Sequence, residues 1–445
     1  MRLICGEARP NAMRFHFAPG GIGDIILPRM NPLMLHEFHH RLGARFTGLN
    51  DREIVNDYGD WLAEHTALRQ SAGVMDLSSR GRICLTGADR VRFLHGQVTN
   101  EVKKLRIGEG CYAAITNNKG KMESDLNIFC LADELLLDFE PGLTEKVSQR
   151  LEKFIVADDV QIVDVAPHYG LLSVQGPRAE AVVSAIGLGG WGERPREPLV
   201  QANPDGSSAA SPHQLPAKPL NFVKISDATL GEVYLMNHAR LAGSAGILPA
   251  GSGDESVATR RQDAGTPGVG GFELFVPNSS LAAVADKLVA AANQSGGRAA
   301  GWQAFETTRI EAGIPRFGMD MDETNIPLEC GPALRDAISY NKGCYIGQEV
   351  INRIHSVGHV TRELRGLRLA DPASAGRPLP QRGDKLFHNG REIGHVTSAV
   401  KSPVLNATIA LSYVRREANQ IGTELTLRTV AGEYPVKIVD LPFVV

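Results

Sequence analysis

One short segment of the chain combines a thiol, a cation and the start of a predicted helix. Residues 342–349 read Lys-Gly-Cys-Tyr-Ile-Gly-Gln-Glu, and an apolar stripe at helical spacing begins at Ile346. Cys344 should therefore precede a helix N-terminus, where unpaired N–H groups and the Lys342 ammonium favour the thiolate. Cys344 and Lys342 are candidate catalytic residues, although a lone cysteine is more commonly a small buried apolar residue.

The rest of this segment has simpler structural explanations. Glu349 and Arg353 stand four apart with the acid first, which predicts an ion pair worth about 0.3–0.5 kcal/mol on the helix surface. Gln348 can bond free backbone groups at the helix start. Arg353 and Arg362 are the better candidates for contact with an anionic partner.

A second group of candidates lies in a predicted hairpin at residues 112–130, with a turn at 117–120. Alternation in its second strand predicts that Glu123 and Asp125 share one face, about 7 Å apart. That face is either solvated or a site, in which the two carboxylates could act as a general acid and base.

Cation sites are not indicated. The acidic turn that holds Asp320, Asp322 and Glu323 is more typical of solvated or capping carboxylates than of a metal site. The six cysteines show no C-x-x-C pair or zinc-like spacing with histidine, so neither a zinc site nor a disulfide framework is predicted. We expect no bound metal.

Composition limits the class of protein. A chain of 445 residues, 43% hydrophobic and 22% charged, can build two or three domains. The net charge of −3 gives no overall basic footprint, so there is no strong signal for direct nucleic-acid binding, while a local basic groove stays open. Scattered cysteines and the lack of a secretory or membrane-spanning pattern predict a soluble cytoplasmic protein, which we expect to be a monomer.

The chain divides into segments of different character. We expect residues 1–29 to be a poorly ordered extension, 201–219 a flexible loop, and 244–268 an insertion at the tip of a hairpin formed by 231–241 and 271–276. Further expected elements are helices at 33–40, 57–71 and 302–313 and a strand at 82–85. From residue 361 onward, short strands with turn signals predict a small β-barrel domain at 361–445.

Eight motifs together resemble the YgfZ-type folate-binding proteins, which are relatives of the T protein (aminomethyltransferase) of the glycine cleavage system. The resemblance covers most of residues 33–445, with 30–360 as the folate-binding region. Its motifs lie at residues 73–78, 86–89, 97–100, 118–121, 175–177, 271–274, 309–315 and 342–349. The last of these resembles the signature of the YgfZ branch, because T proteins lack its cysteine.

The resemblance implies an α+β fold, a three-domain ring around a central cavity with a C-terminal β-barrel. It implies tetrahydrofolate or a derivative in the cavity, with carboxylates on the pterin and Arg or Lys on the glutamate tail. The residues it points to are Asp125 as a catalytic group, Glu273, Asp322, Arg309, Arg353 and Tyr112 as folate contacts, and Gly343, Tyr345, Gly347, Gln348 and Glu349 as motif residues.

The implied function is assembly or maintenance of iron–sulfur enzymes, including tRNA-modifying ones, through a reactive Cys344 that contacts a cluster or a client enzyme. The chain departs from the T-protein pattern in two places, which bear on aminomethyl transfer and on folate binding. Where T proteins read Asp-Asp-Leu, this chain reads Ser124-Asp125-Leu126, and the 244–268 insertion falls beside the hairpin that carries Glu273. A tetrahydrofolate-dependent aminomethyltransferase and a non-catalytic adaptor for client proteins remain as alternatives.

Overall fold

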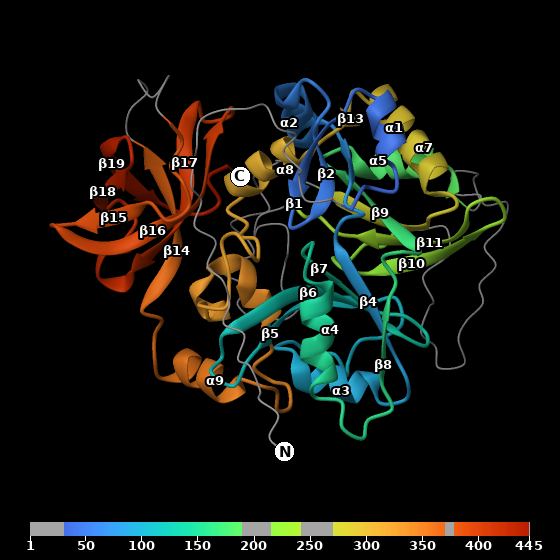
Figure 1. Cartoon of the computed structure of the whole chain (residues 1–445), viewed down its shortest axis with the longest axis horizontal. Coiled ribbons are helices and arrows are strands. Elements are labelled where there is room, and N and C mark those ends of the chain that lie inside the picture. The colour runs from blue at the N-terminus through green and yellow to red at the C-terminus, as the bar shows by residue number, and fades with distance from the viewer. Residues whose placement is uncertain (1–30, 189–214, 242–269, 370–377, 445) are drawn as a thin grey trace, which may run out of the picture.

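A computed structural model describes residues 31–188, 215–241, 270–369 and 378–444 (Figure 1). The expected extension at 1–29 and the insertion at 244–268 lie outside these residues, as does most of the expected loop at 201–219. Residues 215–219 form neither helix nor strand. Among the described helices, none is long and apolar enough to cross a membrane.

The first sheet has five strands in the order β5-β6-β7-β4-β8. They are β4 (Gly81–Thr86), β5 (Gly110–Thr116), β6 (Met122–Cys130), β7 (Leu135–Phe139) and β8 (Gln161–Asp164). Helices α3 (Arg90–Gln97) and α4 (Thr144–Glu152) bury their apolar sides against alternate residues of these strands. The predicted strand at 82–85 and the predicted hairpin are confirmed here as β4 and the β5–β6 pair.

The second sheet has six strands in the order β10-β11-β12-β9-β3-β13. They are β3 (Gly73–Asp76), β9 (Tyr169–Gln175), β10 (Phe222–Asp227), β11 (Gly231–Asn237), β12 (Gly271–Pro277) and β13 (Arg298–Ala299). Helices α1 (His36–Arg41), α5 (Ala179–Ala185) and α7 (Leu281–Gln294) join its core. β11 and β12 pair antiparallel, which confirms that the long insertion separates two adjacent hairpin strands.

The C-terminal part forms a closed barrel in the order β14-β17-β16-β15-β18-β19, as predicted. Its elements are β14 (Arg362–Leu369), β15 (Lys385–His388), β16 (Arg391–Ser402), β17 (Ala407–Arg415), η5 (Arg416–Ala418), β18 (Glu424–Thr429) and β19 (Gly432–Val439). Closure leaves no free sheet edge, and alternate side chains fill the interior.

The remaining elements connect these three bodies, which lie around a common centre in Figure 1. They are β1 (Arg45–Leu49), β2 (Arg52–Asp57), α2 (Trp61–Gln70), α8 (Trp302–Glu311), η2 (Pro327–Glu329), η3 (Pro332–Ala337) and α9 (Gln348–Ser356). The β5–β6 hairpin, α8 and the barrel share one apolar cluster, which includes Met122, Ile310 and Leu411. The mixed α/β three-part ring with a terminal barrel is therefore the observed fold.

Candidate functional site

The segment 342–349, called the octapeptide below, is fixed by the buried side chain of Lys342. Its ammonium donates to the carbonyls of His95 and Val98 at 2.6 Å and of Asn100 at 2.8 Å. These three bonds use all of its N–H donors. Burial lowers the pKa of Lys342 to about 8, so the ammonium form still prevails at neutral pH. Lys342 ties the octapeptide to the end of α3.

The other end of the octapeptide is fixed by contacts with α3 and with the β5–β6 hairpin. The Ile346 N–H donates to the Gly96 carbonyl at 3.2 Å, and the Thr116 hydroxyl donates to the Ile346 carbonyl at 2.6 Å. Gly347 has φ +89°, and a Cβ there would lie 2.6 Å from the Asn117 carbonyl oxygen. Only glycine suits both that φ and that close approach.

Cys344 lies between these two anchors with its side chain exposed to solvent. The helix after it, α9, begins only at Gln348, so the expectation that Cys344 directly precedes the helix is wrong by two to three residues. The Lys342 ammonium is committed to carbonyls and not to the thiol. The octapeptide therefore presents the sulfur to solvent on a loop whose two ends are held.

Sequence reasoning missed His95, which is the imidazole nearest to this loop. Its Nε2 lies 3.5 Å from the position that a Cβ on Gly343 would take. Its Nδ1 lies 3.1 Å from a carboxylate oxygen of Glu101. Burial, and then the charge of Lys342, lower the pKa of His95, which keeps the imidazole neutral at pH 7.

The other residues of the octapeptide can be described by their contacts with the rest of the protein. The Tyr345 ring is buried with the Lys342 ammonium 4.9 Å from its centroid, and its hydroxyl has no hydrogen-bond partner among the described residues. The Gln348 amide reaches back to the Gly343 carbonyl at 3.5 Å. Glu349 and Arg353 are both exposed, and the ion pair predicted between them does not form in the described part of the chain.

The second group of candidates is built on the β5–β6 hairpin. Tyr112 and Asp125 stand on neighbouring strands of one face, and the Tyr112 hydroxyl donates to Asp125 Oδ2 at 2.7 Å. Burial, and then the charge of Glu140, raise the pKa of Asp125 to about 6. The carboxyl is surrounded by protein atoms, yet part of its surface still meets solvent.

The prediction that Glu123 and Asp125 share a face is wrong. The hairpin register shifts by one residue between Ile115 and Thr116, which leaves Glu123 as an extra residue in β6. Glu123 bonds Arg150 of α4, a helix that packs on the other face of the sheet. The β-bulge thus separates the two carboxylates and removes the predicted acid/base pair.

Near Asp125, carboxylates and guanidinium groups alternate in a buried chain, called the central ion network below. Arg240 bonds both Asp138 of β7 and Glu273 of β12, and so bridges the two sheets. His238 lies 2.9 Å from the second oxygen of Glu273. Glu273, an expected pterin contact, therefore has both oxygens engaged, and its pKa lies well below its usual range despite burial, because of Arg240 and His238.

The network continues from Asp138 toward the loop after α8. Arg80 donates to both oxygens of Asp138, at 2.8 and 3.0 Å, and to Glu140 at 2.6 Å. Arg316 bonds the second oxygen of Glu140 at 3.2 Å and lies 3.1 Å from Glu306 of α8. Each of these carboxylates is thus held between two cations.

Arg309 ends the network at the barrel. Its five donors go to Glu306, Asp320, the Ile314 carbonyl and the Ser398 hydroxyl, and only 1% of the residue is exposed. Asp320 in turn accepts from barrel hydroxyls of β16. Arg309, expected as a folate contact, therefore has no N–H donor left for a ligand in this structure.

Asp125 is the exception in this region. Asp138, Glu140, Glu273 and Asp320 all have both oxygens bonded. Asp125, in contrast, has one side-chain donor in the described part of the chain, the Tyr112 hydroxyl at Oδ2. A carboxylate with a single side-chain donor and a pKa of about 6 can exchange a proton with a ligand.

Two further predicted contacts lie away from this centre. Asp322 accepts hydrogen bonds from the Thr324 N–H and hydroxyl and from Arg382 of the barrel loop. Burial by itself raises the pKa of Asp322, but these contacts outweigh burial and the pKa is lowered. Arg353 lies exposed on α9. In the described ranges, no group of three or more His, Cys, Asp or Glu side chains could hold a metal ion.

Comparisons with known proteins agree with this architecture. The GCVT N-terminal domain model matches residues 35–188 and 264–342, and the glycine cleavage T-protein C-terminal barrel domain matches 362–444. An aminomethyltransferase of Clostridium botulinum is 26% identical over 410 residues, which cover 92% of this chain and 96% of that protein. One from Corynebacterium jeikeium is 28% identical over 420 residues, covering 92% and 97%.

A solved structure shows the same fold. The crystal structure of glycine cleavage system aminomethyltransferase T from Bartonella henselae superposes with a TM-score of 0.72 at 24% identity, over 93% of this chain and 98% of that one. The family models and the structural comparison agree over nearly the whole length of the chain. The chain belongs to the glycine cleavage T-protein (GCVT) family.

Proposed function

We propose that the protein binds tetrahydrofolate and acts on a one-carbon unit carried by it, with Asp125 as the carboxylate that meets the reacting nitrogen. The observation that carries this proposal is that Asp125 has one side-chain donor, Tyr112, amid carboxylates that are each held by two cations. Family membership and the relatives named aminomethyltransferase support the reaction class.

The chemistry assigned to the chain is proton handling and orientation. Tyr112 holds Asp125 Oδ2 and thereby turns Oδ1 toward a ligand. A pKa of about 6 allows the carboxyl to accept a proton at neutral pH and to return it. Tetrahydrofolate would supply the nitrogen to which the one-carbon unit is attached.

The fit of a folate to the other implied contacts is uneven. Glu273 and Arg309 are both saturated by internal partners, so neither has a free donor or acceptor for pterin or tail. Asp125 and Tyr112 fit a folate, because a carboxylate that can accept a hydrogen bond and an aromatic ring lie next to each other. We assign these two residues to the folate and leave Glu273 and Arg309 to the ion network.

The test of the transferase is formation of methylenetetrahydrofolate from an aminomethyl donor. Asp125→Ala should abolish it, while Cys344→Ser should not change it. Glu123→Gln is the matched control, because it alters a carboxylate of the same strand on the opposite face. Equal activity of Asp125→Ala and wild type would remove Asp125 from the reaction.

A second candidate function rests on the octapeptide. Its thiol is exposed while the two ends of the loop are held, as expected for a group that reacts with a partner protein. By resemblance to the YgfZ branch, Cys344 would serve the maintenance of iron–sulfur enzymes, including tRNA-modifying ones, in the cytoplasm. Lys342 would act as a positioning residue and the neutral His95 as the proton acceptor nearest the loop.

Complementation of a deletion strain separates the two functions. Maintenance by Cys344 predicts that Cys344→Ser lowers the activity of tRNA-modifying iron–sulfur enzymes, whereas Asp125→Ala does not. Cys130→Ser, at another partly exposed cysteine, is the control. If neither Cys344→Ser nor Asp125→Ala has an effect, the protein acts as an adaptor through its surface.

A further inference from the structure

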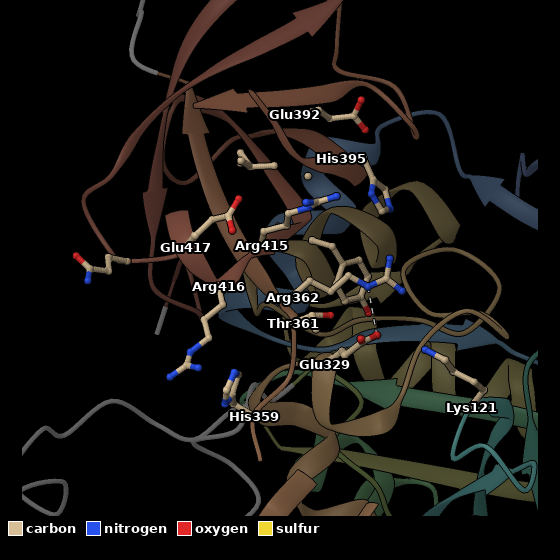
Figure 2. Close-up of a pocket in the computed structure, with 14 residues that line it drawn as sticks. Lys121, Glu329, His359, Thr361, Arg362, Glu392, His395, Arg415, Arg416 and Glu417 are labelled. Carbon is tan, nitrogen blue, oxygen red and sulfur yellow. Dashed lines mark hydrogen bonds and ion pairs between the residues drawn. The ribbon is translucent and has the colours of Figure 1, made fainter. Parts of the chain in front are cut away.

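A large cavity lies outside the centre, between the barrel and the tip of the β5–β6 hairpin (Figure 2). Its volume is about 1030 Å³, and its walls come from the hairpin, η2, β14, β16 and β17. Tyr413 forms part of its floor, and the Tyr413 hydroxyl bonds the buried Cys330 behind it. Tyr112 packs against the same apolar cluster that holds Cys330 and Tyr413.

Two cations in this cavity share one neutral acceptor. The Lys121 ammonium donates to the Thr324 carbonyl at 2.7 Å, and the Arg362 guanidinium donates to the same oxygen at 3.0 Å. Glu329, at 3.3 Å from Arg362 Nε, is the carboxylate that partly offsets them. Two like charges on one carbonyl repel each other, and an anion between them would relieve this repulsion.

The barrel wall carries charges of both signs, with Arg415 and Arg416 beside Glu392 and Glu417. Arg415 and Arg416 are exposed and have no hydrogen bond or ion pair with any described side chain. The Glu392 carboxylate on the same wall forms an ion pair with Lys385. Burial, followed by the charges of Arg362 and Lys385, lowers the pKa of His395, as expected in an electropositive environment.

Arg362 and Arg415 stand directly opposite each other on the paired barrel strands β14 and β17, so both guanidinium groups belong to the barrel side of the cavity. Figure 2 shows Lys121 approaching Arg362 and Glu329 from the hairpin, while His395 and Arg415 project from the barrel. An anion in the cavity could therefore meet cations from both the hairpin and the barrel. The volume is at the upper end of that of small-molecule pockets, which span roughly 300–1,000 Å³.

We propose that this cavity binds an anionic ligand, carboxylate or phosphate, through Lys121 of the hairpin and Arg362 and Arg415 of the barrel. Arginine forks suit both kinds of anion. The site is distinct from the proposed folate centre, because neither Tyr112 nor Asp125 lines it. It is the local basic groove that the overall negative charge of the chain does not exclude.

The experiment is calorimetric titration of the whole protein with two probes, inorganic pyrophosphate and a triglutamate peptide, at low ionic strength. At least one probe should bind, more weakly as salt is raised. Lys121→Gln and Arg415→Gln should each weaken binding roughly tenfold, the effect of one charge-assisted contact. The probe that binds more tightly identifies phosphate or carboxylate as the preferred group.

Arg428→Gln is the matched control, since it removes one exposed barrel cation that pairs with Glu433 outside the cavity. It should bind the probes as wild type does. Asp125→Ala should also bind them normally, which keeps this site distinct from the proposed function. The proposal fails if neither probe binds wild type, or if Lys121→Gln and Arg415→Gln weaken binding no more than Arg428→Gln does.

Discussion

The octapeptide and the central ion network both bury charged side chains, but different groups compensate the charge in the two regions. In the network, each cation meets carboxylates from other elements, so charge is cancelled by charge across the sheets and the barrel. In the octapeptide, one ammonium is held by neutral carbonyls and the reactive atom stays in solvent. The network joins three bodies around Asp125, whereas the octapeptide displays a thiol.

The largest effect is expected from breaking the network. Arg80→Met leaves Asp138 and Glu140 buried with reduced compensation, and should lower the free energy of unfolding by about 3–5 kcal/mol. Urea unfolding at pH 7 measures it. Arg92→Met, which removes an exposed guanidinium from Asp89 and Asp158, should have a much smaller effect. Similar losses in both variants would contradict a structural role for the network.

The octapeptide anchor should come next. Lys342→Met leaves three buried carbonyls without their donor, and should lower the free energy of unfolding by about 3 kcal/mol. The exposed Lys104→Met, which touches Glu101 only at 3.8 Å, should have almost no effect. Hydrogen exchange should also show that the amides of residues 343–347 open more readily in Lys342→Met, and unchanged exchange would refute the anchor.

The close approach at the hairpin can be tested with a pair of glycines. In Gly347→Ala, the new Cβ is disfavoured both by the positive φ and by the close contact with the Asn117 carbonyl. In Gly383→Ala, φ is +95° as well, but no atom lies within 4 Å of the new Cβ. Gly383→Ala should therefore cost about 1 kcal/mol and Gly347→Ala about 2–3 kcal/mol. Thermal unfolding measures both, and equal losses would mean that the hairpin contact is unimportant.

Asp125 should give a smaller effect with its own pH signature. Because its folded pKa is raised to about 6, ionisation of the buried carboxyl lowers stability as pH rises from about 4 to 6. Asp125→Asn should then be more stable than wild type above pH 6 and equal to it below pH 4. The opposite trend is expected for Glu140, whose lowered pKa gives stability that is lost as pH falls.

The smallest effect is expected at the thiol. Cys344→Ser changes an exposed atom, so the free energy of unfolding should stay within about 0.5 kcal/mol of wild type. Urea unfolding compares this variant with Cys84→Ser, at a buried cysteine, which should be clearly destabilised. A large loss in Cys344→Ser would show that the sulfur is packed and not displayed.

Local pattern was enough to predict the β5–β6 hairpin, helix α8 and the barrel, because their signals lie within a few residues of one another. It could not predict the β-bulge at Glu123, since alternation alone does not reveal an extra residue in a strand. The network was also missed, because Arg240 and Asp138 stand 102 positions apart. The one charged residue inside the apolar strand 135–139, Asp138, was the available signal.

The most direct test of the central claim is equilibrium binding of tetrahydrofolate to wild type, Asp125→Ala and Cys344→Ser. With Asp125 as the folate-facing carboxylate, wild type and Cys344→Ser should bind alike, and Asp125→Ala should bind at least about tenfold more weakly. Failure of the wild-type protein to bind tetrahydrofolate, or equal affinity of Asp125→Ala and wild type, would contradict it.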